Sequence, residues 1–373
     1  MRKMLIVANV SKEHVRKFHL PFIVYMKKQG WQVDVACRMD APIPECDHTF
    51  DLPCDRNPFY GEIGKSIEIL KNLLQKESYD VLVCNTITGA IIARLAARPF
   101  RKKGLKVFYI NHGLHFFEGA PLSRWLLGYP VEKILAPYTD LLITINSADY
   151  QMAKKYLGLA NVECICGIGV DLQRFKTCKM TRDDRNDLRR SLGIAPDDFV
   201  LTYVAEINEN KNQLMLLEAL HYIRQAIPNA RMFLVGPEHD GGKVRKFVVR
   251  HGLSDSVFLL GWRDDVAKLL KASDVYVASS KSEGLGINLI EAMACDLPVI
   301  ASKNRGHAEI IQHGINGFLV EQNDAEEMAK YVLEIATDLQ LRENITDRAQ
   351  IDISKYEIEQ VLAELDRIFT MYA

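Results

Sequence analysis

Two glutamates separated by seven residues, Glu283 and Glu291, stand in the segment from 279 to 302. Glu283 follows an apolar run, in a loop where its carboxylate would accept hydrogen bonds from sugar hydroxyls or stabilise a developing positive charge. Gly284 and Gly286 let the backbone come close to a ligand there. The helix that follows begins near Gly286, and the amides of its first turn attract phosphate. The segment therefore predicts a binding site for a ligand with hydroxyl and phosphate groups.

Glu291 is the only charged residue between Gly284 and Cys295. A carboxylate in such an apolar helix is costly unless hydrogen-bond donors satisfy it. The two hydroxyls of a ribose are donors of matching geometry, which favours a nucleotide as the ligand. A structural ion pair with an arginine or a lysine is the alternative, and the sequence leaves it open.

Short β-branched runs alternate with amphipathic stretches and position these loops. Strands are predicted at 4–10, 33–37, 80–84, 106–110, 141–145, 162–165, 200–204, 231–235, 257–260, 274–279, 298–301 and 317–320. Helices are predicted at 18–28, 63–76 and 87–98 in the first half. The alternation is typical of βαβ units, so we expect an α/β chain with two doubly wound parallel sheets. Ligands then bind beyond the carboxyl ends of the strands, in a cleft between the two domains.

The length of 373 residues also indicates two domains, at about 150 residues per domain. Glycines at 167 and 169 and the polar stretch after them place the boundary near residue 170. We therefore expect a first, acceptor-side domain at 1–170 and a second, donor-binding domain at 171–353. An amphipathic helix at 354–373 is expected to return to the first domain.

The composition excludes several classes of protein. Nearly half of the residues are hydrophobic, so each domain can bury a core, and no apolar run approaches the ~18 residues of a membrane-spanning helix. The first ten residues read as a strand and lack the features of a signal peptide. Eight cysteines without a CxxC pair favour reduced thiols over a zinc site or a disulfide frame. These features predict a cytoplasmic protein.

The net charge of −1 conceals an asymmetry between the two halves. Residues 1–170 carry 22 Lys and Arg against 16 Asp and Glu, whereas residues 171–373 carry 25 against 32. A positive first half favours contact with a polyanion or an anionic membrane surface, and composition drift between domains is the alternative. The segment 122–135, rich in Leu, Trp and Tyr, could lie in a headgroup region, or it could be an ordinary core helix.

Several motifs together resemble the retaining GT-B glycosyltransferases of family 4, which use nucleotide-sugar donors. They are EGLGINLIEAMACDLPVIAS from residue 283, NHGLHFFEGAP from 111, GIGVD from 167, NKN from 210, GHAEII from 306 and GINGFLV from 314. The match runs in order along nearly the whole chain, and the segment 111–121 looks most like the capsular and exopolysaccharide branch. The resemblance implies two Rossmann-like domains facing a cleft, with the C-terminal helix packed back on the first domain.

The resemblance also implies a role for each matching residue. Glu291 would hold the ribose, Glu283 the transferred sugar, and Lys211 the diphosphate. His112 would contact a sugar hydroxyl from the first domain, and the loop 261–263 would hold the base. The nucleotide sugar would thus be bound by Lys211, Arg263, Glu283, Gly284, Leu285, Gly286, Ile287, Asn288, Leu289 and Glu291, and the catalytic residues would be His112, Glu283 and Lys211. On residue type alone, Lys211 could instead be a solvated lysine and His112 a structural histidine.

The chain departs from the family pattern before Lys211. Many relatives carry Gly-Arg there, with the Arg on the diphosphate, whereas this chain has Ala205-Glu206. Either Lys211, the helix amides and another base neutralise the diphosphate, or donor binding is weakened. There is no DxD motif and no His or Cys cluster with ligand spacing, so we expect no metal and no other cofactor.

The sequence thus predicts a retaining hexosyltransferase. It would move a hexose or N-acetylhexosamine from a nucleotide sugar, with UDP as the favoured nucleotide, to a lipid-linked cell-surface polysaccharide intermediate. The expected partners are the nucleotide sugar and the lipid-linked glycan acceptor, and no nucleic acid. Peripheral contact with the inner face of the plasma membrane is an open option. The alternatives are a non-catalytic nucleotide-sugar-binding subunit, for which Glu206 is the discriminating feature, and a GT-B epimerase of UDP-sugars.

Overall fold

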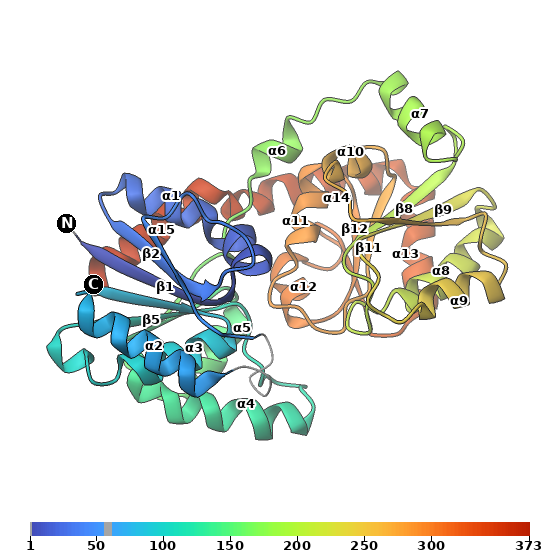
Figure 1. Cartoon of the computed structure of the whole chain (residues 1–373). Coiled ribbons are helices and arrows are strands. Elements are labelled where there is room, and N and C mark those ends of the chain that lie inside the picture. The colour runs from blue at the N-terminus through green and yellow to red at the C-terminus, as the bar shows by residue number, and fades with distance from the viewer. Residues whose placement is uncertain (1, 56–61) are drawn as a thin grey trace. The chain divides into compact units, whose positions relative to one another are not determined.

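The chain forms two compact α/β units in a computed structural model that describes residues 2–55 and 62–373 (Figure 1). The first unit comprises Met1–Gly169 with Glu359–Ala373, and the second comprises Val170–Ile358. Each unit holds one sheet whose strands all pair in parallel, with seven strands in the first and six in the second. The prediction of two doubly wound parallel sheets is confirmed.

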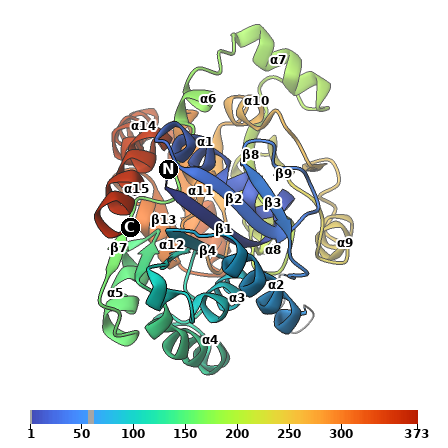
Figure 2. The ribbon, with the colours of Figure 1, turned by 60° about the vertical axis from the view of Figure 1, so that its left-hand side comes forward.

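The first sheet has the strand order β3-β2-β1-β4-β5-β6-β7, and the run β3-β2-β1-β4 is labelled in Figure 2. Its strands are β1 (Lys3–Val10), β2 (Gln32–Arg38), β3 (His48–Asp51), β4 (Val81–Asn85), β5 (Lys106–Asn111), β6 (Leu141–Thr144) and β7 (Val162–Cys164). The sequence patterns predicted six of these strands to within one or two residues. They missed β3, a four-residue edge strand with mostly exposed side chains that lacks an apolar pattern.

Helices cover both faces of the first sheet. They are η1 (Ser11–His19), α1 (Leu20–Lys28), α2 (Ile63–Lys76), α3 (Ile87–Ala97), η2 (Arg101–Lys103), α4 (Leu122–Leu135), η3 (Ala136–Tyr138), α5 (Ser147–Tyr156) and α15 (Ile358–Tyr372). The core between the sheet and α2, α3 and α5 is built of Leu, Val, Ala and aromatic side chains. On the opposite face, Phe369 of α15 packs against Phe22 of α1 and Phe108 of β5, with ring centroids 5.4 and 5.0 Å apart. The last helix therefore packs on the first unit, as predicted.

The helix α15 begins later than the sequence pattern suggested. A short 3₁₀ turn, η4 (Ile353–Tyr356), comes first, and Glu357 is extended and forms an isolated parallel bridge with Val170. The chain thus closes the second unit before it returns to the first.

The second sheet has the order β10-β9-β8-β11-β12-β13. Its strands are β8 (Phe199–Val204), β9 (Ala230–Val235), β10 (Val257–Gly261), β11 (Val275–Ala278), β12 (Val299–Ser302) and β13 (Phe318–Val320). Its helices are α6 (Leu172–Lys176), α7 (Arg182–Ser191), α8 (Gln213–Ala226), α9 (Lys243–Arg250), α10 (Val266–Lys271), α11 (Ile287–Ala294), α12 (Arg305–Ile310), α13 (Ala325–Thr337) and α14 (Leu339–Asp352). The central strands β8 and β11 are neighbours, so the loops at their carboxyl ends meet at one edge of the sheet.

None of the helices in the described part of the chain is long and apolar enough to cross a membrane. All eight cysteines lie in the described part of the chain, and no disulfide joins any of them.

Candidate active site

The two loops that follow β8 and β11 are tied together by side-chain hydrogen bonds. The Asn210 side-chain amide donates to the carbonyl of Ser282 at 3.0 Å, and the Ser279 hydroxyl donates to the carbonyl of Lys211 at 2.7 Å. The Asn288 side chain at the start of α11 donates to the carbonyl of Val204 at 3.1 Å. These bonds fix the loop that carries Lys211 against the loop that carries Glu283.

Lys211 and Glu283 form an ion pair with 2.5 Å between Nζ and Oε1, although 72 residues separate them. Their side chains are largely covered, with 22% and 16% of their surface exposed. Burial by itself would raise the pKa of Glu283, but the Lys211 ammonium and, to a smaller extent, His307 hold that pKa below its ordinary value. Glu283 is therefore ionised at neutral pH and sits beside the cation expected to meet the diphosphate.

Glu291 lies on α11 in the opposite electrostatic state. Burial raises the pKa of its carboxyl to about 7, and the more distant charge of Arg174 offsets this only in part. No hydrogen-bond donor contributes to its environment among the described residues. A structural ion pair, the alternative left open by the sequence, does not form with Arg174 or any other described residue. Glu291 is thus a half-buried carboxyl group whose oxygens accept no hydrogen bond from the described residues. A ligand could supply the missing donors.

The start of α11 is shaped by two close approaches. Gly286 has φ of +98°, and a Cβ there would lie 3.1 Å from Cδ2 of His307. A Cβ on Gly306 would lie 2.8 Å from both Cβ and the carbonyl oxygen of Glu283. The second contact is closer than real Cβ atoms come, so only glycine at 306 allows the α12 backbone to pass behind Glu283.

The predicted amide cradle, Gly284 to Leu289, is formed by backbone and not by side chains. Leu285 and Leu289 are buried in the core of the unit. The amide of Leu289 already donates to the carbonyl of Gly286 at 3.0 Å, so it belongs to the helix. Gly284 and Gly286 precede α11, and Ile287 and Asn288 begin it, where first-turn amides lack intrahelical acceptors.

His307 is a site residue to which the sequence analysis gave no role. Its ring is fully buried, and Nδ1 lies 2.7 Å from the carbonyl of Ser302, so Nδ1 carries the proton. Nε2 is buried without a hydrogen-bond partner and is left as an acceptor. Its ring interacts electrostatically with Glu283, and burial lowers the pKa of His307. The motif GHAEII contained this residue, but only the tertiary contact with Glu283 connects it to the site.

Arg305 also lies at this end of the sheet. Its Nε donates to the carbonyl of Glu283 at 3.3 Å, which places a second cationic side chain beside the Glu283 backbone. Glu206, the residue that stands where many relatives have arginine, is exposed.

Arg263, predicted to bind the donor, follows β10 and forms a bidentate pair with Asp265, with N–O distances of 2.8 and 2.6 Å. This carboxylate raises the pKa of Arg263. A phosphate would have to compete with Asp265 for this guanidinium, as it would with Glu283 for the ammonium of Lys211. Trp262, next to it, is 69% exposed.

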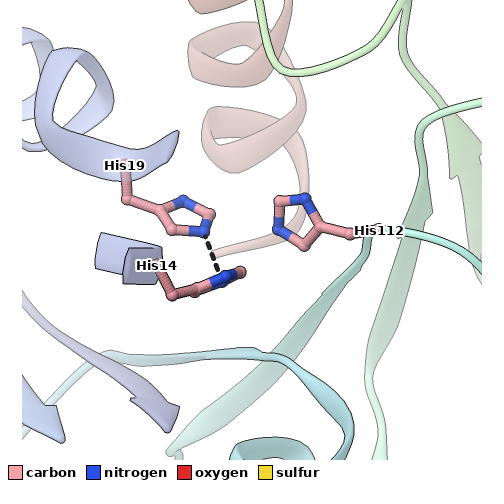
Figure 3. Close-up of side chains that lie close together, drawn as sticks. All are labelled: His14, His19 and His112. Carbon is pink, nitrogen blue, oxygen red and sulfur yellow. Dashed lines mark hydrogen bonds between the residues drawn. The ribbon is translucent and has the colours of Figure 1, made fainter. Parts of the chain in front are cut away.

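His112, the third predicted catalytic residue, belongs to the first unit and follows β5. Burial lowers its pKa to about 4, and its Nε2 is buried without a hydrogen-bond partner. The structure brings it together with His14 and His19 of η1, which the sequence analysis did not single out (Figure 3). No short-range spacing in the sequence could have revealed this group, because its members lie on two separate segments.

Comparison with known proteins agrees with this arrangement of domains. A family model described as "Glycosyl transferases group 1" matches residues 184–352, and one described as "Glycosyl transferase 4-like" matches residues 3–146. The chain is 38% identical over 375 residues to glycosyltransferase EpsD of Bacillus subtilis, covering 100% of this chain and 97% of that protein. It is 28% identical to the UDP-Gal:alpha-D-GlcNAc-diphosphoundecaprenol alpha-1,3-galactosyltransferase of Escherichia coli, over 90% of this chain and 86% of that one.

Solved structures share the whole fold at lower identity. Anabaena Alr3699/HepE in complex with UDP and glucose superposes with a TM-score of 0.82 at 22% identity, covering 100% of both chains. WaaG, a glycosyltransferase involved in lipopolysaccharide biosynthesis, gives a TM-score of 0.74 at 17% identity, covering 98% and 99%. The chain is thus 38% identical to a glycosyltransferase along its whole length, and it shares its fold with solved glycosyltransferase structures. It belongs to the GT-B glycosyltransferases of family 4.

Proposed function

We propose that the protein transfers a hexose or N-acetylhexosamine from a UDP-sugar to a lipid-linked polysaccharide intermediate, with retention at the anomeric carbon. The observation that carries the proposal is the contrast between the two glutamates of one loop and helix. The Lys211 ammonium lowers the pKa of Glu283 and keeps this carboxylate ionised, whereas burial raises the pKa of Glu291 to about 7. Glu283 would therefore act as a charged group beside Lys211, and Glu291 would accept hydrogen bonds from ligand hydroxyl groups.

In this reading the ribose hydroxyls donate to Glu291 and draw it into the ionised state, because hydrogen bonds to a carboxylate lower its pKa. Lys211 stands where the leaving diphosphate gathers charge, and a cation already in place stabilises that charge without reorganisation. Glu283 would then accept hydrogen bonds from the transferred sugar, and Nε2 of His307 offers a further acceptor beside it.

The diphosphate is proposed to be neutralised without a metal ion. Lys211 supplies one positive charge, and the first turn of α11 supplies amides and the positive end of a helix dipole. Arg305, which contacts the backbone of Glu283, is the second cation that we assign to the diphosphate. It would replace the arginine that many relatives carry where this chain has Glu206. It lies on the strand-to-helix turn that follows β12 and not on the loop after β8.

The nature of the donor and the acceptor is supported by the names of similar proteins. The E. coli relative is named for UDP-Gal and for a diphosphoundecaprenol acceptor, and a Campylobacter jejuni relative, 24% identical, is named for a diphospho-undecaprenol acceptor. HepE was solved with UDP-glucose as well as with UDP. A diphospholipid acceptor fits a protein whose first half carries an excess of positive charge.

We further propose that α4 makes peripheral contact with the membrane that holds such an acceptor. Its outer side presents large apolar side chains that are 66–72% exposed: Leu122, Leu126, Leu127 and Ile134. Its Trp and Tyr, which the sequence suggests as headgroup anchors, face inward instead. Trp125 and Tyr129 both pack on Phe116, with ring centroids 5.4 and 5.3 Å away. The leucines are thus the residues that would enter the interface.

The inner side of α4 holds this helix firmly in place. Glu132 of α4 forms a buried ion pair with Arg94 of α3, with 2.8 Å between the closest atoms, and the guanidinium also stacks over Tyr109. Breaking such a buried pair is strongly destabilising. The exposed leucines are therefore presented by a fixed helix.

The proposed activity is tested with purified full-length protein, a panel of nucleotide sugars and a lipid-diphosphate glycan acceptor, with transfer followed by mass spectrometry. We expect one UDP-sugar to be used in the presence of a chelator, and the new linkage to keep the donor's anomeric configuration by NMR. Glu283→Ala and Glu291→Ala should abolish transfer in folded protein. The matched control is Lys281→Ala, which removes an exposed lysine of the same loop and should keep activity. Full activity in both glutamate variants would contradict the site.

A further inference from the structure

Three histidines of the first unit converge on one point: His14, His19 and His112. The Nε2 atoms of His14 and His19 share a hydrogen bond of 3.1 Å, and the ring of His112 stands 5.0 and 5.1 Å from their rings, centroid to centroid (Figure 3). One ligand nitrogen from each ring lies within 4.8 Å of the other two. Over residues 2–55 and 62–373, this is the one group of three or more His, Cys, Asp or Glu side chains with such geometry.

The backbone takes an unusual form to bring two of these rings together. His14 and His19 lie on η1, which is a π-helix, and they are five residues apart. In an α-helix, residues five apart point about 140° away from each other, because each residue turns the helix by about 100°. The i to i+5 bonding of a π-helix puts them on the same side instead, and π-helical turns are rare and frequent at functional sites.

The ring nitrogens of the group suit metal binding, because neutral imidazole is the form in which histidine binds metals. Nε2 of His112 is buried with no hydrogen-bond partner. In a tetrahedral zinc site with bonds of about 2.0–2.1 Å, the ligand nitrogens lie about 3.3 Å apart, close to the separation seen for His14 and His19.

We propose that His14, His19 and His112 bind a divalent transition-metal ion, with Zn²⁺ as the best match, through three imidazole nitrogens. Three neutral histidines leave a fourth position open and leave the charge of the ion uncompensated. An anionic oxygen or a water would complete it. The side chains of His14 and His112 are half-buried, and that of His19 is buried. Phe18 packs its ring against both, at 5.5 and 6.1 Å, and forms an apolar wall.

The proposed metal site includes His112, the residue that the family resemblance assigns to a sugar hydroxyl. It uses the first unit only, whereas Lys211, Glu283 and Glu291 belong to the second. The proposal therefore keeps metal-free handling of the diphosphate and adds a metal in the other unit.

The experiment uses untagged full-length protein stripped with a chelator and then dialysed. Titration with ZnCl₂ by calorimetry should give one site per chain, and Co²⁺ should give the intense visible absorption of a four-coordinate ion. His14→Gln, His19→Gln and His112→Gln should each weaken zinc binding. Loss of an outer-shell partner typically costs about 10–100-fold in metal affinity, so loss of a direct ligand should cost at least about 100-fold.

The matched control is His115→Gln, which removes an exposed histidine only three residues from His112 and outside the group. It should keep wild-type zinc affinity. His19 is buried, so circular dichroism checks the fold of each variant, and the half-buried His14 and His112 carry the test should His19→Gln unfold. Wild-type protein that binds no zinc stoichiometrically, or zinc affinity unchanged in His14→Gln and His112→Gln, would overturn the proposal. So would variants that instead lose binding of inorganic pyrophosphate to the metal-free protein, because the group would then be an anion site.

Discussion

Replacing Glu291 by glutamine should stabilise the protein while it weakens nucleotide binding. Glutamine has the size of glutamate but carries no charge to desolvate. The pKa of Glu291 is about 7 in the folded protein against an ordinary value of 4.5. At pH 8, where Glu291 is ionised, this difference lowers the free energy of unfolding by about 3 kcal/mol. Contact of the carboxylate with solvent makes the loss smaller.

The sign follows from proton binding. Because the pKa is raised on folding, the folded protein holds more protons than the unfolded chain between about pH 4.5 and 7, and stability falls as pH rises through that range. At pH 5 the same arithmetic leaves under about 1 kcal/mol. We therefore expect Glu291→Gln to exceed the wild type in free energy of unfolding by about 2–3 kcal/mol at pH 8 and by little at pH 5.

The assay is urea denaturation of the ligand-free proteins at both pH values, followed by circular dichroism, with UDP affinity measured by calorimetry. UDP should bind the variant at least about tenfold more weakly, because hydrogen bonds to a charged acceptor are worth about 1.5–3 kcal/mol. Glu283→Gln is the matched control. Its pKa is lowered by Lys211, so removing that charge should destabilise the protein at pH 8. Equal unfolding free energies for Glu291→Gln and wild type at pH 8 would show that the protein itself already satisfies Glu291, and the ribose assignment would lose its physical reason.

Three further changes test the remaining parts of the site. Lys211→Ala should lower UDP affinity at least about tenfold by calorimetry and raise the pKa of Glu283, and an unchanged affinity would contradict its role at the diphosphate. Gly306→Ala should reduce kcat in a folded protein, because its Cβ would lie 2.8 Å from Glu283 and displace that side chain; wild-type kcat would show that the loop yields without consequence. Leu126→Glu should reduce co-sedimentation with anionic vesicles, whereas Leu339→Glu, a similarly exposed leucine of the second unit, should not; equal losses in both would remove α4 as the contact.

The secondary structure could be predicted from the sequence where it depends on a local pattern of apolar residues. All twelve predicted strands begin and end within two residues of those found, because a parallel strand buried on both faces is a continuous apolar run. The π-helix η1 was not predicted, and its geometry brings His14 close to His112, which follows β5 far along the chain.

The sequence by itself determined the alternation of strands and helices, the two glutamates with their glycines, and the positive first half. These depend on residue type and spacing along one segment. Only the tertiary structure decided that Lys211 reaches Glu283, that His307 lies beside it, and that α4 turns its aromatic rings inward and its leucines outward. It also decided which of the two glutamates keeps its proton. Protonation depends on burial and on charges brought from distant segments, and the spacing of residues along a chain does not contain that information.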